Sequence, residues 1–126
     1  MCMSKKGEKK KILIVDDDVA IRVRYVELLS RANFDCDTAS SADEANEILK
    51  INGVDLVLLD IKMPSVEGST LYETMQLFHN GVKVVVSSVY PITEQKKMVP
   101  GAAAYYDKSE GVTVLLEKIR EVLAAG

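Results

Sequence analysis

Short apolar runs alternate along this chain with longer stretches in which apolar residues recur at helical spacing. The runs predict five strands, at 11–15, 35–39, 54–59, 82–87 and 103–106. The periodic stretches predict five helices, at 19–32, 42–52, 68–79, 92–99 and 112–124. Strands that alternate with helices are typical of a parallel sheet. The pattern therefore predicts an α/β fold, a doubly wound five-stranded parallel sheet with helices on both faces.

Residues that favour helix starts support the first two helices. Asp18 is the candidate N-cap of the first helix. Ser41 or Ser40 can cap the second, with Glu44 as the partner in a capping box. Helical spacing predicts the buried face of the first helix, which comprises Val19, Val23, Val26 and Leu29.

The length and composition of the chain fit one globular domain. Its 126 residues can bury a core but are too few for two domains. No apolar stretch approaches 18 residues, so no transmembrane helix is expected. Cys2 and Cys36 are poorly placed for a disulfide, and the N-terminus lacks the features of a secretory signal. A cytoplasmic protein without membrane contact is therefore expected.

Charge is distributed unevenly along the chain. Residues 1–11 contain five lysines and one glutamate, whereas the remainder carries 11 basic and 18 acidic residues. A domain with this acidic excess is not expected to bind nucleic acid directly. The lysine-rich segment is typical of a solvated arm, although it could also contact an anionic partner. We expect a basic disordered arm at 1–10 and one domain at 11–124.

Charged residues follow three of the predicted strands. The triplet Asp16, Asp17 and Asp18 follows the first strand, Asp60 the third and Lys108 the fifth. In an open parallel sheet, groups just past the strand ends share one crevice. Carboxylates gathered there repel one another unless a divalent cation lies among them. Taken singly, the aspartate triplet could be a helix cap, Asp60 a turn acid and Lys108 a surface lysine. Because all of them are expected at the same edge of the sheet, one shared site is favoured.

Such a site can support phosphoryl chemistry. A carboxylate at a strand end can act as a nucleophile toward phosphorus and form an aspartyl phosphate. Magnesium held by neighbouring acids neutralises developing charge, and a lysine can hold a phosphoryl oxygen. Ser87 and Ser88 lie at the end of the fourth strand, where a hydroxyl could bond a further phosphoryl oxygen. Either serine alone carries little information.

Three motifs together resemble the receiver domain of response regulators in two-component signalling. They are the apolar run with its acidic triplet at 12–18, the D-x-x-M-P-x-x-x-G loop that begins at Asp60, and the aromatic-x-x-Lys ending from Tyr105 to Lys108. The resemblance covers residues 11–124, and the motifs occur in the family's order and spacing. It implies a chemotaxis-receiver-like domain with the flavodoxin-like strand order 2-1-3-4-5.

The resemblance implies a phosphorylation site that binds Mg²⁺. Asp60 resembles the phosphoacceptor of the family. The implied metal ligands are Asp17, Asp60 and the backbone carbonyl of Lys62, with Asp16 acting through water. Mg²⁺ is therefore the expected cofactor.

The resemblance also implies a switch. Lys108 would contact the phosphoryl group, Ser88 would be the switch hydroxyl, and Tyr105 would be the aromatic residue that turns inward on activation. Ser88 is preferred to Ser87 because it lies 28 residues after Asp60 and its following residues fit the family better.

The implied function is a phosphorylation-dependent signalling switch and not an enzyme, apart from limited self-phosphorylation and autodephosphorylation. A sensor histidine kinase or phosphotransfer protein would supply the phosphoryl group to Asp60. A changed face would then be recognised by a downstream effector protein or by an output domain missing from this chain.

Three alternatives use a similar sheet. A magnesium phosphohydrolase with a D-x-D-x-[TV] signature would need Thr or Val at Ala20. A flavodoxin-like cofactor binder is disfavoured because three aspartates after the first strand would repel its phosphate. A pseudo-receiver that signals by protein contact stays open, because Val89 and Ser109 replace the small residue and the proline usual in the family. Ser109 also predicts an altered exit from the fifth strand.

Overall fold

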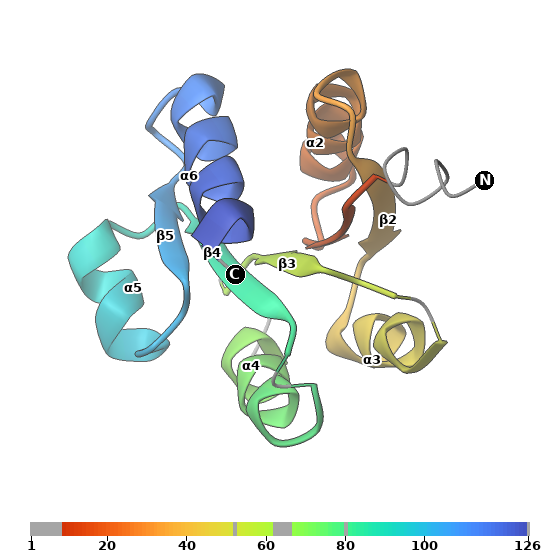
Figure 1. The fold of residues 1–126 in the computed structure, drawn as a ribbon. Coiled ribbons are helices and arrows are strands. Elements are labelled where there is room, and N and C mark those ends of the chain that lie inside the picture. The colour runs from red at the N-terminus through yellow and green to blue at the C-terminus, as the bar shows by residue number, and fades with distance from the viewer. Residues whose placement is uncertain (1–8, 52, 62–66, 80, 126) are drawn as a thin grey trace.

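The computed structural model describes residues 9–51, 53–61, 67–79 and 81–125, which form five strands alternating with five helices (Figure 1). The strands are β1 (Lys11–Val15), β2 (Asp35–Ala39), β3 (Leu56–Leu59), β4 (Lys83–Ser88) and β5 (Ala104–Asp107). The helices are α2 (Val19–Arg31), α3 (Ala42–Ile51), α4 (Glu67–Phe78), α5 (Ile92–Met98) and α6 (Val112–Ala125). All strands are parallel in the order β2-β1-β3-β4-β5, which confirms the expected fold.

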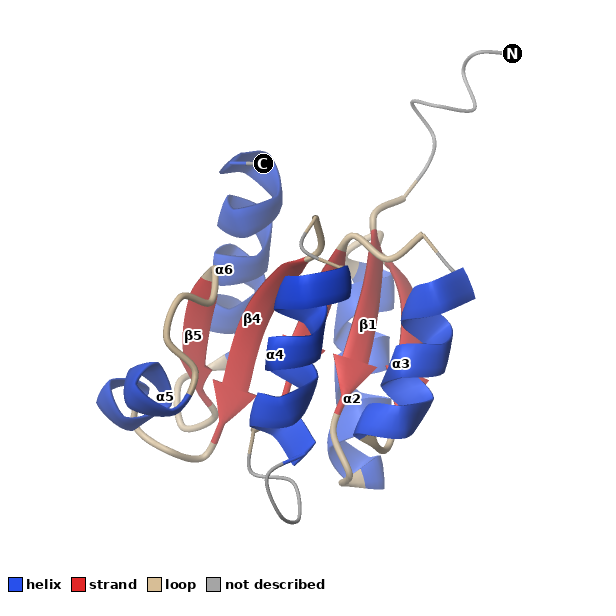
Figure 2. Ribbon diagram, turned by 90° about the horizontal axis from the view of Figure 1, so that it is seen from below, coloured by secondary structure: helices blue, strands red, loops and turns tan. Residues whose placement is uncertain are grey.

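Helices cover both faces of the sheet. α2 and α6 lie on one face, α3 and α4 lie on the other, and α5 flanks the edge strand β5 (Figures 1 and 2). One apolar cluster joins Leu13 and Val57 to α3 and α4, and a second joins Ile14 and Leu58 to α2 and α6. Because β1 and β3 are covered on both sides, they read as continuous apolar runs and not as alternating ones.

The strand boundaries differ slightly from those expected. β3 begins at Leu56, two residues later than the apolar run suggested. The N–H of Lys11 donates to the side chain of Asp55 (2.8 Å), which takes the place of a backbone partner there.

β4 and β5 each end one residue later than expected, because Ser88 pairs with Asp107. Ser88 is therefore a strand-end residue beside the carboxyl edge of the sheet.

The buried face of α2 differs from the predicted one. Val19 and Val23 are 62% and 63% exposed, whereas Tyr25 and Leu29 are buried. A helix turns by about 100° per residue, so the stripe that starts near Ile21 faces the sheet while the stripe that starts at Val19 faces solvent. The prediction that Val19 and Val23 are buried was wrong.

The predicted helix caps are confirmed. Asp18 accepts hydrogen bonds from two N–H groups in the first turn of α2, at 2.9 and 3.4 Å. Ser41 Oγ accepts the N–H of Glu44 (3.2 Å), and the Glu44 carboxylate accepts the N–H of Ser40 (2.6 Å). None of the described helices has the length and apolar character needed to cross a membrane. The expected arm at 1–10 lies almost wholly outside the described residues.

Candidate functional site

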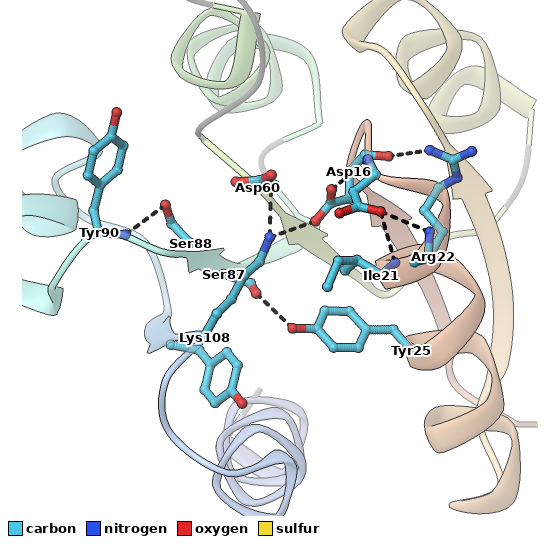
Figure 3. A network of polar contacts seen from close by, with 12 residues as sticks. Asp16, Ile21, Arg22, Tyr25, Asp60, Ser87, Ser88, Tyr90 and Lys108 are labelled. Carbon is cyan, nitrogen blue, oxygen red and sulfur yellow. Dashed lines mark hydrogen bonds and ion pairs between the residues drawn. The ribbon is translucent and has the colours of Figure 1, made fainter.

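Charged side chains from three strand ends meet at the carboxyl edge of the sheet (Figure 3). Asp16 and Asp17 follow β1, Asp60 follows β3 and Lys108 follows β5. Backbone pairing continues one residue past two of these strands. The N–H of Asp16 donates to a carbonyl of β2 (3.1 Å), and the N–H of Asp60 donates to a carbonyl of β1 (2.9 Å). The sheet itself therefore positions two of the carboxylates.

Three carboxylates form an acidic pocket. One oxygen from each of Asp16, Asp17 and Asp60 lies within 4.8 Å of the others. Asp16 and Asp60 are only 2% and 5% exposed, whereas Asp17 is open to solvent. A set of hard oxygen donors at this spacing fits Mg²⁺, whose charge would offset their mutual repulsion. The other expected ligand, the carbonyl of Lys62, lies outside the described residues.

Lys108 bridges two of the three carboxylates. Its Nζ lies 2.9 Å from Asp16 Oδ2 and 3.4 Å from Asp60 Oδ2. Burial by itself lowers the pKa of Lys108, but the hydrogen bond to Asp16 and the charges of Asp60 and Asp16 outweigh burial and raise the pKa above its usual value. Lys108 is therefore a cation at neutral pH and lies beside the carboxylate expected to carry the phosphoryl group.

Two residues at the start of α2 hold Asp16 in place by hydrogen bonds. The N–H of Asp18 donates to Asp16 Oδ1 (2.9 Å), while Asp16 Oδ2 accepts from Lys108. Arg22 Nη1 donates to the backbone carbonyl of Asp16 (2.6 Å). Both carboxylate oxygens of Asp16 are thus already engaged, which is compatible with contact to a metal through water.

The two serines at the end of β4 lie on opposite sides of the sheet. Ser87 Oγ lies 3.5 Å from the Tyr25 hydroxyl of α2, whereas Ser88 Oγ accepts a hydrogen bond from the N–H of Tyr90 (3.3 Å) (Figure 3). The carbonyl of Ser88 also accepts the N–H of Lys108 (2.8 Å). Ser88, the predicted switch hydroxyl, is therefore linked through the backbone to the lysine of the acidic pocket.

Tyr105 and the exit of β5 complete the surroundings of the site. The half-buried Tyr105 hydroxyl donates to the carbonyl of Val99 (2.6 Å) and accepts the N–H of Ala102 (3.1 Å). After the strand, the N–H of Ser109 donates to the Asp107 carboxylate (2.8 Å). This bond lowers the pKa of Asp107 and shapes the turn at the position where the family usually has proline.

Sequence reasoning missed three residues near the site. Arg22 contacts the backbone of Asp16, Tyr25 approaches Ser87, and Gln95 is completely buried. Tyr25 could have been found, because it precedes the buried Leu29 by four residues and so shares its helix face. The sequence pattern could not indicate the contact of Arg22 or the burial of Gln95, because a polar residue on a helix normally faces water.

Comparison with known proteins agrees with this geometry. The family model of the response regulator receiver domain matches residues 12–120. Sporulation initiation phosphotransferase F of Bacillus subtilis is 27% identical over 118 residues, which cover 90% of this chain and 94% of that protein. Chemotaxis protein CheY of Treponema pallidum is 32% identical over 122 residues, which cover 93% of this chain and 85% of that protein.

Solved receiver structures share the fold. A CheY-like receiver domain protein from Methanospirillum hungatei has a TM-score of 0.86 at 33% identity, covering 94% of this chain and 96% of that one. The response regulator TrrA of Thermotoga maritima, in complex with Mg²⁺-BeF, has a TM-score of 0.82 at 29% identity, covering 90% and 98%. Receiver domains are signalling switches of two-component systems and bind Mg²⁺ at an acidic cluster. The family match, the strand order and the acidic pocket together show that this chain belongs to the response regulator receiver domain family.

Proposed function

We propose that this chain is a switch in which Asp60 accepts a phosphoryl group with the help of Mg²⁺. The observation that carries the proposal is the acidic pocket, in which oxygens of Asp16, Asp17 and Asp60 converge within 4.8 Å while Lys108 is the cation that bridges two of them. Burying negative charge in excess of its partner is costly. The pocket is therefore better suited to receiving a cation than to stabilising the fold.

Each residue of the pocket has a proposed role in phosphoryl transfer. Asp17, Asp60 and the carbonyl of Lys62 would hold the metal, with Asp16 acting through water. Bound Mg²⁺ would neutralise charge on the phosphoryl group. A carboxylate oxygen of Asp60 attacks phosphorus as the bond from phosphorus to the donor's histidine nitrogen breaks, and that nitrogen keeps the electron pair. Lys108 Nζ, 3.4 Å from Asp60, then holds a phosphoryl oxygen.

Phosphorylation would act on the strand ends beside Asp60. It adds about 1.5 to 2 negative charges and three acceptor oxygens. Ser88 and Lys108 each gain a charge-assisted contact only in that state, which biases the loop toward a second arrangement. As Ser88 turns toward Asp60, Tyr105 fills the space left behind. A downstream effector protein, or an output domain of a longer chain, would recognise the changed face of β4, α5 and β5.

The phosphodonor, a sensor histidine kinase or phosphotransfer protein, is proposed to dock over the start of α2. Val19 and Val23 are 62% and 63% exposed on a helix whose first residue lies two positions after Asp17. They line a groove of about 540 Å³ together with Arg22, Val26, Glu27 and Thr38. A protein donor would gain apolar burial there while its histidine approaches Asp60. The cytoplasm is the proposed setting.

Intact-protein mass spectrometry tests the phosphoacceptor directly. Incubation with acetyl phosphate should add one phosphate to the unaltered chain only when Mg²⁺ is present, and Asp60→Ala should gain none. Ser88→Ala should still gain the phosphate but should lose the change in the face of β4, α5 and β5. Ser87→Ala, which alters the opposite side of the sheet, should keep both the phosphate gain and the changed face. No mass gain under any condition would refute the proposal and favour a pseudo-receiver that signals by protein contact alone.

A further inference from the structure

α5 has an unusual attachment to the domain. It has seven residues, and its N-cap, Pro91, makes no side-chain hydrogen bond. A helix this short is not stable without tertiary contacts. Gln95 is its one fully buried side chain, at 0% exposure, while the C-cap Val99 is buried and accepts a hydrogen bond from Tyr105. A polar amide therefore takes the anchoring position that an apolar side chain normally occupies.

The Gln95 amide connects three segments of the chain. Its Nε2 donates to the carbonyl of Tyr90 (2.7 Å) and to the carbonyl of Tyr106 (2.9 Å). Because both partners are acceptors, the amide nitrogen must face them and the orientation of the side chain is determined. Gln95 Oε1 is consequently buried, and no donor among the described residues reaches it. The arrangement thus leaves one buried acceptor unsatisfied, which is unfavourable.

These contacts lead directly to the proposed switch residues. Tyr90, held by Gln95 at its carbonyl, donates its N–H to Ser88 Oγ (3.3 Å). Tyr106 lies two residues before Lys108, whose N–H donates to the carbonyl of Ser88 (2.8 Å). One side-chain amide therefore joins the ends of β4 and β5 that carry both residues expected to contact the phosphoryl group. Hydrogen bonds weaken steeply when their geometry changes, so this link depends on the position of Ser88.

We propose that Gln95 is a positioning residue of the switch, a latch that holds α5 in its resting place until Ser88 turns toward the phosphoryl group. The inference rests on the proposed phosphorylation of Asp60. When Ser88 turns, Tyr90 loses the acceptor of its N–H and the adjoining peptide rotates, which removes the carbonyl bound by Gln95. α5 lacks an apolar anchor of its own and pivots about Val99. The face beside β5 thereby reports the state of Asp60.

Hydrogen–deuterium exchange of α5 tests the latch. Gln95→Met keeps a similar side-chain length but removes both donors, and Gln76→Met makes the same change at an exposed position of α4 as the matched control. In the unaltered chain, Mg²⁺ with beryllofluoride, a mimic of the phosphoryl group, should speed amide exchange in α5 by about 30-fold, as expected for opening two hydrogen bonds. Gln95→Met should exchange fast before the addition and change little after it, whereas Gln76→Met should behave like the unaltered chain.

A merely structural role for Gln95 predicts a different result. Exchange would then rise in β1 and β3 as well as in α5, and the response to beryllofluoride would persist, which would overturn the latch. Nuclear magnetic resonance of the Gln95 side-chain amide in the unaltered chain gives a test that does not depend on a variant. Its amide protons should be protected at first and exchange faster after beryllofluoride is added, and unchanged protection would also overturn the latch. Phosphorylation by acetyl phosphate is measured in parallel by intact mass. If the chain gains a phosphate but α5 does not respond, only the latch is wrong. If Asp60 gains no phosphate, the proposed function is wrong.

Discussion

Replacing Lys108 by methionine tests the charge balance of the acidic pocket. Its Nζ lies 2.9 Å from Asp16 and 3.4 Å from Asp60, so the variant leaves two buried carboxylates without their cation. At an effective dielectric constant of about 20, each contact is worth roughly 5 to 6 kcal/mol, most of which offsets the cost of burying the charges. Removing one partner of a buried ion pair costs about 3–5 kcal/mol. We therefore expect Lys108→Met to lower the free energy of unfolding by about 3 kcal/mol without Mg²⁺.

Added Mg²⁺ should reduce this loss because the metal supplies positive charge to the same carboxylates. Urea denaturation followed by circular dichroism, with and without Mg²⁺, measures the free energy of unfolding. Lys97→Met is the matched control. Lys97 lies 3.7 Å from Glu94 but both side chains are exposed, so its removal should change the free energy of unfolding by less than about 1 kcal/mol.

A second variant checks the cause of the expected loss. Lys108→Met combined with Asp60→Asn also removes the negative charge of one carboxylate that faced Lys108, so the double variant should recover part of the stability that the single variant lost. The reasoning would be refuted if Lys108→Met cost no more than Lys97→Met, or if Mg²⁺ left its deficit unchanged.

The Tyr106 hydroxyl should titrate late, because burial first, and then the nearby Tyr25 and acidic side chains, raise the pKa of Tyr106 to about 12. The folded state thus holds the proton of Tyr106 more tightly than the unfolded chain does. This contribution to the free energy of unfolding is therefore complete below about pH 10 and is lost as pH rises toward 12. Tyrosinate absorbance and alkaline unfolding should both show a transition in this pH range, and Tyr106→Phe should lack it. On α2, Val23→Glu should slow phosphotransfer from a histidine kinase that phosphorylates the unaltered chain but leave phosphorylation by acetyl phosphate unchanged. Ile51→Glu, at an 80% exposed position of α3, should leave the rate of phosphorylation by either donor unchanged. If Val23→Glu slowed phosphorylation equally with both donors, the docking proposal would be contradicted.

The order of elements and the location of the acidic site were predictable from the chain. β1 and β3 are apolar at every position except Lys11 because helices cover both of their faces, so each read as a strand without ambiguity. Strand ends in a parallel sheet meet at one edge, which is why Asp16, Asp60 and Lys108 could be assigned to one site although Lys108 and Asp16 are 92 residues apart. Asp18 was recognisable as a cap because capping depends on neighbouring residues alone.

Local patterns by themselves thus determined the strands, the helices and the edge where the charged residues gather. They did not determine which face of α2 turns inward, and Val19 and Val23 lie in solvent while Tyr25 is buried. Nor did they indicate that Gln95 would be buried, because its two partners are backbone carbonyls on other segments. Helix orientation and the pairing of buried polar groups depend on contacts between segments that are distant in the chain, and only the tertiary structure decides these contacts.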